Sequence, residues 1–218
     1  KSNYFKTYVA VTAQHREMLD QVLNLFDIEP DFDLNLMSQN QSLESLTSKI
    51  LTGSSKIFKE IRPDLIFVQG DTTTTFAAAL AAFYNKIKVG HIEAGLRTNL
   101  MFNPFPEEIN RRMTSSLSSF HFPPTDKSEK NLLKEGINSQ KVLITGNTVI
   151  DALLIVSKKI EKESNYFENF FSENYGIKFN QKKIVLVTGH RRESFGQGFE
   201  SICNAIKKIA ITNDIEII

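Results

Sequence analysis

The chain alternates short apolar runs with longer segments of helical spacing from its beginning to its end. Each apolar run has the length of a buried strand, and the segments between the runs are long enough for crossover helices. This alternation predicts an α/β fold in which parallel sheets carry helices on both faces. The expected strands are Tyr8 to Thr12, Asp33 to Met37, Leu65 to Gln69, Ile87 to Ile92, Ser119 to Phe122, Lys141 to Thr145, Ile184 to Thr188 and Ile215 to Ile218.

Apolar residues spaced three and four apart predict the helices between these strands. The expected helical segments are 18–26, 43–61, 76–83, a short one around 132–133, and 147–164. The stretch that follows, 165–183, is aromatic and polar without a clean period, so we interpret it as part of a linker. We therefore expect one α/β domain over residues 1–150. Over residues 151–218 we expect the linker and the opening unit of a second α/β domain.

The composition excludes several classes of protein. The 26 basic and 25 acidic residues give a net charge of +1, and no run of like charge suggests a nucleic-acid or membrane surface. The single cysteine, Cys203, excludes a disulfide framework and a cysteine-rich metal site, and we expect a buried thiol. Without a signal peptide or a bilayer-length apolar stretch, a cytoplasmic protein is expected. The chain starts without methionine and stops inside an apolar run, so we expect it to be part of a longer protein.

Polar residues follow three of the predicted strands directly. Asp71, Glu93 and His190 each come just after an apolar run. Ligands of open α/β sheets bind at the carboxyl ends of the strands, so these side chains are candidates for one site. Two carboxylates and a histidine on that edge favour acid/base chemistry on a phosphorylated ligand.

Each strand end also has a plain structural interpretation. In GDTTTT, Thr72 or Thr73 can cap a helix whose free N–H groups hold an anion, or Asp71 is itself only the N-cap. In HIEAGLRT, Gly95 is expected to let the backbone approach a ligand. Arg97 in the same segment is either half of a structural ion pair or a residue of the site.

Two further segments carry candidate residues. In NPFPEEINRRM, Glu107, Asn110 and Arg111 share one helical face, and one of the two adjacent glutamates is expected only to complement the helix dipole. In TGHRRES, His190 lies beside two arginines, a cluster that suits a diphosphate. The four histidines lack the spacing of metal ligands, and His121 is expected to be a satisfied core or strand-end residue.

Taken together, these segments closely resemble the non-hydrolysing UDP-N-acetylglucosamine 2-epimerases of bacteria, and the resemblance covers nearly the whole chain. It rests on VTAQHREMLDQVL, PDLIFVQGDTTTTFAAALAAFY, VGHIEAGLRT, PFPEEINRRM, HFPPTDKSEKNLLKEG, ITGNTVIDALL and VTGHRRESFGQG. The resemblance implies two Rossmann-like domains of GT-B type, a homodimer, and no nicotinamide or metal. It also implies reversible conversion of UDP-N-acetylglucosamine to UDP-N-acetylmannosamine by elimination and re-addition of UDP, within the biosynthesis of cell-surface polysaccharides.

The same resemblance implies roles for particular residues. Asp71, Glu93 and Glu107 take the places of the acid/base carboxylates, and His190 takes that of the histidine near the diphosphate. The other expected substrate contacts are Arg97, Arg111, Arg191 and Glu193. The expected contacts to a second UDP-N-acetylglucosamine, which acts as an activator, are Gln14, Gln41 and Arg192.

The departures from the family pattern leave alternatives open. The first strand and its Gly-Thr-Arg-Pro-Glu loop are absent, and the segments that hold uracil and ribose would lie beyond Ile218, so we expect the 218-residue chain alone to be inactive. A hydrolysing relative, an epimerase of another UDP-acetamido sugar, a GT-B glycosyltransferase and a non-catalytic nucleotide-sugar sensor are the alternatives.

Overall fold

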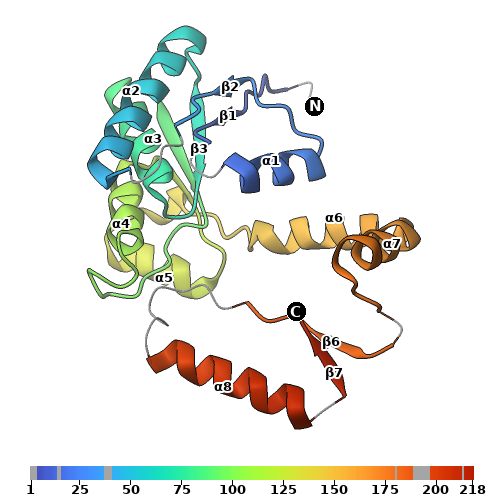
Figure 1. Cartoon of the computed structure of the whole chain (residues 1–218). Coiled ribbons are helices and arrows are strands. Elements are labelled where there is room, and N and C mark those ends of the chain that lie inside the picture. The colour runs from blue at the N-terminus through green and yellow to red at the C-terminus, as the bar shows by residue number, and fades with distance from the viewer. Residues whose placement is uncertain (1–3, 14–15, 37–40, 180, 189–196, 213) are drawn as a thin grey trace. The chain divides into compact units, whose positions relative to one another are not determined.

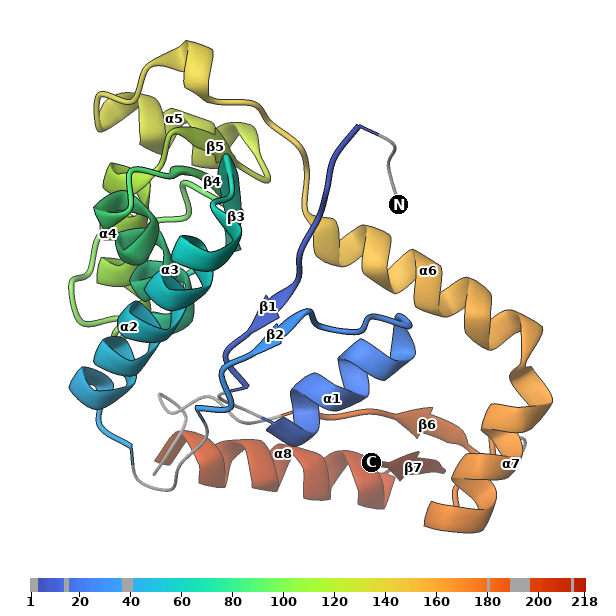
Figure 2. The ribbon, with the colours of Figure 1, turned by 90° about the horizontal axis from the view of Figure 1, so that it is seen from above.

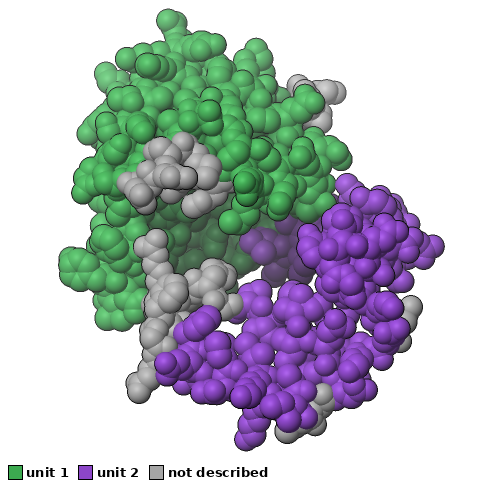
Figure 3. Space-filling view, viewed as in Figure 1, with its two compact units in different colours: residues 1–148 green, residues 149–218 purple. Residues whose placement is uncertain are grey.

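The computed structural model describes residues 4–13, 16–36, 41–179, 181–188, 197–212 and 214–218. The chain forms two compact units, unit 1 over Lys1–Thr148 and unit 2 over Val149–Ile218 (Figure 3). We describe each unit by itself. The boundary at residue 150 between functional domains stays a prediction.

Within the described part of unit 1, the strands form two parallel sheets. The first sheet pairs β1 (Ala10–Val11) with β2 (Phe32–Asp33), and the second has the order β3-β4-β5. The strands of the second sheet are β3 (Leu65–Gln69), β4 (Lys88–Ile92) and β5 (Phe120–Phe122). Their register aligns Gln69, Ile92 and Phe122, so all three strands end at one edge. This shared carboxyl edge is the one expected to hold the candidate site.

Helices lie on both sides of these strands. Figures 1 and 2 show α2, α3 and α4 on one side and α1 on the other. Unit 1 contains α1 (Arg16–Leu25), α2 (Leu43–Ile61), α3 (Thr73–Tyr84), α4 (Glu107–Leu117), α5 (Asp126–Lys134) and the 3₁₀ helix η1 (Ser139–Lys141). Buried side chains of α2 and α3 pack against Val68 of β3 and Val89 of β4. This packing buries one face of the sheet and fixes α3 at the strand ends.

Local signals set the bounds of the helices that support the site. Ser42 caps α2, and Arg62, in the left-handed region ahead of Pro63, ends it. At α3, the Thr72 hydroxyl accepts a hydrogen bond from the N–H of Thr75 at 3.3 Å. At α5, the Thr125 hydroxyl accepts from the N–H of Ser128 at 3.2 Å.

The described residues of unit 2 form a parallel strand pair and three helices, which Figure 1 labels. Its elements are α6 (Thr148–Lys162), whose first residue belongs to unit 1, α7 (Ser164–Tyr175), β6 (Lys183–Val185), α8 (Gln197–Thr212) and β7 (Ile215–Ile217). The helix α7 occupies most of 165–183, where the sequence shows no clean period, and the interpretation of this stretch as part of a linker stays a prediction. Aromatic rings stabilise this helix along its length, since Tyr166 contacts Phe170 and Phe170 contacts Tyr175.

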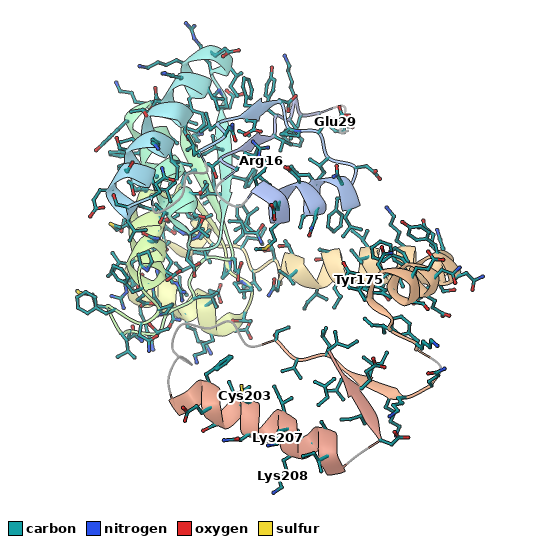
Figure 4. The ribbon with its side chains drawn as sticks, viewed as in Figure 1. Arg16, Glu29, Tyr175, Cys203, Lys207 and Lys208 are labelled. Atoms are coloured by element: carbon teal, nitrogen blue, oxygen red, sulfur yellow. The ribbon has the colours of Figure 1, made fainter. Side chains whose placement is uncertain are left out.

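Three expectations need correction. The predicted strand at Lys141 to Thr145 reduces to η1 and one bridge between Val142 and His121. The first two strands have two residues each, where the sequence predicts five. Cys203 is exposed rather than buried, and Figure 4 labels it on α8. Among the described residues, no helix is both long and apolar enough to cross a membrane.

Candidate active site

At the carboxyl edge of the sheet, backbone hydrogen bonds join the residue after one strand to the last residue of the next strand. The N–H of Gly70 donates to the carbonyl of Ile92 at 3.0 Å, and the N–H of Glu93 donates to the carbonyl of Phe122 at 3.0 Å. Gly70 has φ +74° and Glu93 has φ +65°. Left-handed backbone at a non-glycine residue costs on the order of 1 kcal/mol, and such residues cluster at active sites. The sheet thus holds the Glu93 backbone in a strained and defined position.

The Glu93 carboxylate lies beside the loop that carries Asp71. A Cβ atom built on Gly70 would be 3.8 Å from Glu93 Oε2. The side chain is half-buried, and among the described residues none hydrogen-bonds to its carboxylate. This carboxylate is therefore available to a ligand at the strand ends.

Asp71 is held by α4. Arg111 Nη2 lies 2.5 Å from Asp71 Oδ2, and Asn110 Nδ2 donates to the Asp71 carbonyl oxygen at 3.0 Å. The N-cap of α3 is Thr72, so the interpretation of Asp71 as a mere helix cap is wrong. The Asp71 side chain is 28% exposed, so it contacts Arg111 and is also accessible to solvent.

Glu107 begins α4 on the face that points to Asp71. Residues at i, i+3 and i+4 lie on one side of a helix, and Asn110 and Arg111 both contact Asp71. The Glu107 side chain is half-buried, and no hydrogen bond or ion pair joins it to another described residue. Asp71 and Glu93 thus follow adjacent strands at one edge of the sheet, and Glu107 begins the helix that contacts Asp71.

The neighbouring Glu108 has a different environment. Its side chain is 1% exposed, and its carboxylate accepts hydrogen bonds from the backbone N–H groups of Thr98 and Asn99. Burial acts to raise the pKa of this carboxyl, but these hydrogen bonds outweigh it and the pKa is lowered from its ordinary value. Of the two adjacent glutamates, Glu108 is therefore the one enclosed by the protein.

Arg97 is occupied by intramolecular partners. Its guanidinium donates two hydrogen bonds to Glu135, at 2.8 and 2.7 Å, and others to Ser115 Oγ and the Leu96 carbonyl. Its side chain is 1% exposed. This geometry favours the ion-pair alternative for Arg97 over direct contact with a substrate, and its role as a substrate contact stays a prediction.

The interpretation of Gly95 as a place of close ligand approach is wrong. A Cβ atom at Gly95, which has φ +85°, would lie 2.2 Å from the Ser128 carbonyl oxygen and 3.0 Å from Leu132 Cγ. Gly95 is therefore required by close packing on α5, and its absent side chain leaves no space for a ligand.

Two buried histidines lie next to each other behind this edge. His91 in β4 pairs in register with His121 in β5, and both are at most 1% exposed. His91 Nε2–H donates to the Gly70 carbonyl at 2.7 Å, which fixes the tautomer of the ring and the turn before Asp71. Burial lowers the pKa of each histidine to about 4, so both rings are neutral near pH 7.

The sequence places His91 on the same side of the strand end as Glu93 but did not predict its hydrogen bond to Gly70, and the expectation for His121 was wrong in part. The signal available for His91 was its position two residues before Glu93 in HIEAGLRT. The expectation that His121 is satisfied is wrong, because neither ring nitrogen has a hydrogen-bond partner among the described residues.

Most of the remaining candidates cannot be placed by the described residues, and Gln41 has partners within the protein. Those that lie outside the described residues are Gln14, His190, Arg191, Arg192 and Glu193. Gln41 is half-buried, and its amide, oriented to satisfy both atoms, donates to the Leu36 carbonyl and accepts from Lys49 Nζ, each at 3.0 Å. No group of three or more potential metal ligands occurs in the part of the chain that the structure describes.

Comparison with known proteins gives a consistent match along the chain. The family model described as UDP-N-acetylglucosamine 2-epimerase matches residues 1–218. The UDP-N-acetylglucosamine 2-epimerase of Escherichia coli K12 is 52% identical over 219 residues, which cover 100% of this chain and 58% of that protein. A putative UDP-N-acetylglucosamine 2-epimerase of Clostridium acetobutylicum is 54% identical over 211 residues, covering 96% of this chain and 53% of that protein.

Solved structures agree with the fold. The UDP-GlcNAc 2-epimerase from Neisseria meningitidis bound to UDP-GlcNAc has a TM-score of 0.88 at 44% identity, over 100% of this chain and 65% of that one. The Staphylococcus aureus MnaA–UDP co-structure has a TM-score of 0.85 at 40% identity, over 99% and 55%. The predicted α/β fold of GT-B type is thereby confirmed. The chain spans about half the length of the curated relatives it matches, 53% and 58% of the two named above.

Proposed function

This chain belongs to the UDP-N-acetylglucosamine 2-epimerase family, and we propose that the protein containing it interconverts UDP-N-acetylglucosamine and UDP-N-acetylmannosamine. The observation that supports the proposal is that Asp71 and Glu93 follow adjacent strands at one sheet edge, and that α4, which begins at Glu107, contacts Asp71 through Arg111. Fold alone would not assign an activity, because one fold serves many chemistries.

The proposed chemistry explains why several carboxylates are needed. The C2 hydrogen of the sugar has no adjacent carbonyl, so its simple removal as a proton is too costly. We propose anti-elimination: a base takes the C2 proton while the C1–O bond breaks, and UDP departs with the bonding electrons to leave 2-acetamidoglucal. Re-addition of UDP at C1 and of a proton at the opposite face of C2 gives the epimer. One group must serve each face, so at least two titratable side chains are required.

The residues of this chain fit those roles in different ways. Glu93 and Glu107 are half-buried and have no carboxylate partners among the described residues, so each can accept or deliver a proton. Asp71 is fixed by Arg111 and suits a role that needs a defined orientation. The assignment of each carboxylate to a face of the sugar stays open. His190 remains the proposed histidine near the diphosphate, and Arg191 and Glu193 remain proposed substrate contacts.

The ligands and the oligomeric state that we propose also come from membership of this family. UDP-N-acetylglucosamine is the proposed substrate and also the proposed activator at a second position involving Gln14, Gln41 and Arg192. The proposed working form is a homodimer in the cytoplasm, without a cofactor. Measurement of the solution mass and of the rate against substrate concentration would test the dimer and the activator separately.

Proton NMR of the reaction in deuterated water tests the proposed activity. Reversible epimerisation should place deuterium at C2 while the sugar stays linked to UDP. Release of free N-acetylmannosamine and UDP would instead indicate a hydrolysing relative, and a requirement for an acceptor would indicate a glycosyltransferase. The 218-residue chain and a polypeptide of the relatives' length should be assayed together, with negligible turnover expected for the former.

A further inference from the structure

Glu108 is the most enclosed carboxylate near the proposed site, and the proposed chemistry does not use it. Its side chain is 1% exposed, and each carboxylate oxygen faces two nitrogen atoms. Oε1 accepts from the Asn99 N–H and from Arg112 Nε, both at 3.1 Å. Oε2 accepts from the Thr98 N–H at 3.0 Å and lies 3.6 Å from Arg111 Nη1. A buried charge with this many donors is held in one position.

Arg111 connects Glu108 to Asp71. Its Nη1 faces Glu108 and its Nη2 faces Asp71, while its Nε has no hydrogen-bond partner among the described residues. The guanidinium side chain is 11% exposed, between a carboxylate that is 1% exposed and one that is 28% exposed. The buried end is therefore fixed, and the more exposed end takes its position from it.

We propose that Glu108 is a positioning residue, which orients the Asp71 carboxylate by holding Arg111 between them. The proposal rests on the proposed epimerase function, since it assigns Asp71 to the chemistry. Without the charge of Glu108, Arg111 has one counter-ion fewer and its guanidinium can turn away from Asp71. Displacement of a reacting group by about 1 Å can cost on the order of 100-fold in rate.

The same carboxylate also fixes the segment that leads to Glu107. Its hydrogen bonds to the N–H groups of Thr98 and Asn99 fasten the start of that segment to the first turn of α4. Arg112, which donates to Glu108, also donates to Asn99 Oδ1 at 2.8 Å. This second function is structural, so the test must separate it from the effect that passes through Arg111.

A double-mutant cycle separates the two effects, in a protein of the relatives' length. Glu108→Gln should lower kcat by about 10- to 100-fold and change KM for UDP-N-acetylglucosamine by less than about threefold. Arg111→Lys keeps the positive charge but cannot reach both carboxylates with two fixed nitrogens, and it should lower kcat similarly. If Glu108 acts through Arg111, the double variant should match Arg111→Lys alone. The proposal would be overturned if the fold-losses in kcat of the two single variants multiplied in the double variant. An unchanged kcat in Glu108→Gln would also overturn it.

A spectroscopic measurement separates failure of this proposal from failure of the proposed reaction. In ¹⁵N NMR spectra of the arginine side chains, the Arg111 guanidinium should rotate slowly in the unsubstituted protein and freely in Glu108→Gln. Slow rotation in both proteins would overturn the positioning role whether or not epimerisation is observed. If Glu108→Gln does not fold, Arg111→Lys decides alone, and a kcat equal to that of the unsubstituted protein would refute the proposal.

Asp33→Asn supplies the matched control. The Asp33 carboxylate also accepts from a backbone N–H, that of Asn35 at 2.8 Å, and from an arginine, Arg16 at 2.6 Å. Figure 4 labels Arg16, which begins α1. This substitution removes a similar set of contacts away from α4, and it should leave both kcat and the Arg111 signal unchanged.

Discussion

Unit 1 and unit 2 bury their apolar residues to very different extents. In unit 1, Ile50 of α2, Ala77 of α3 and Val89 of β4 are fully buried. In unit 2, neither α6 nor α7 has a buried residue, and Leu153 of α6 is 65% exposed. Because burial of apolar surface is the main source of stability, unit 1 has a core of its own and the helices of unit 2 do not. The proposed acid/base carboxylates all lie in the unit with the core, where preorganised groups can be held firmly.

The largest expected effect tests whether the chemistry belongs to unit 1. In a protein of the relatives' length, Asp71→Asn keeps the size of the side chain but removes its charge, and it should lower kcat by about 10²- to 10⁴-fold while UDP still binds. Initial rates by NMR and calorimetric titration with UDP would measure both quantities. Glu168→Gln on α7, an exposed carboxylate of unit 2, is the control and should keep the unsubstituted rate. Full turnover in Asp71→Asn would show that the chemistry does not need Asp71, whereas UDP binding without turnover in the unsubstituted protein would favour the non-catalytic sensor.

A pair of core substitutions tests the difference in burial. Ile50→Ala in α2 should lower the free energy of unfolding by about 2–5 kcal/mol, since it removes fully buried methyl groups and leaves a cavity. Leu153→Ala in α6 should change it by less than about 0.5 kcal/mol. Urea unfolding followed by circular dichroism measures both. A cost above about 1 kcal/mol at Leu153 would show that the α6 face is covered in solution.

The buried histidines predict that unit 1 loses stability in mild acid. His91 and His121 have folded-state pKa values of about 4, below the 6.5 expected when unfolded, so the unfolded chain binds more protons between these pH values. The stabilisation that comes from the neutral histidines should therefore be fully present above pH 6.5 and should fall as the pH drops toward 4. The loss attributable to His91 is on the order of 3 kcal/mol. The free energy of unfolding, measured at several pH values, should depend less steeply on pH in His91→Gln. An equally steep dependence in that variant would contradict the assignment to His91.

The smallest expected effect compares two helix starts. Thr72→Ala removes the hydroxyl that caps α3, and it should cost about 1 kcal/mol of stability. Glu163 at the start of α7 makes no side-chain capping bond, so Glu163→Ala should stay within about 0.5 kcal/mol. Thermal unfolding of the two variants measures the contrast, and equal losses would show that the Thr72 hydroxyl is not what fixes α3.

Sequence patterns predicted elements better than they predicted neighbours. The bounds of β3 and α2 match the structure, because apolar spacing and Pro63 define them locally. The sequence also predicted that Asp71 and Glu93 follow neighbouring strand ends, since parallel strands share a carboxyl edge. By contrast, the packing of Gly95 against Ser128 depends on α5, which lies more than thirty residues further along. The spacing of apolar residues along the chain predicts local structure and therefore cannot predict such a long-range contact.

The two adjacent glutamates show the same limit at closer range. Glu107 and Glu108 lie about 100° apart on a helix, so the fold encloses one and leaves the other half-buried. Only the positions of Thr98, Asn99 and Arg111 determine which is which. The helix α7 escaped prediction for another reason, since its aromatic residues contact one another without forming a single apolar stripe.

The hydrogen bond from His91 to Gly70 makes this ring a natural reporter of the proposed site. Its Nε2 proton is shielded from solvent and directed at the carbonyl just before Asp71. We expect a downfield imidazole resonance that exchanges slowly with water and shifts when a ligand displaces the β3–α3 turn. Occupancy of the carboxylate cluster could thus be followed in the unmodified protein, without a label on any of the acidic groups.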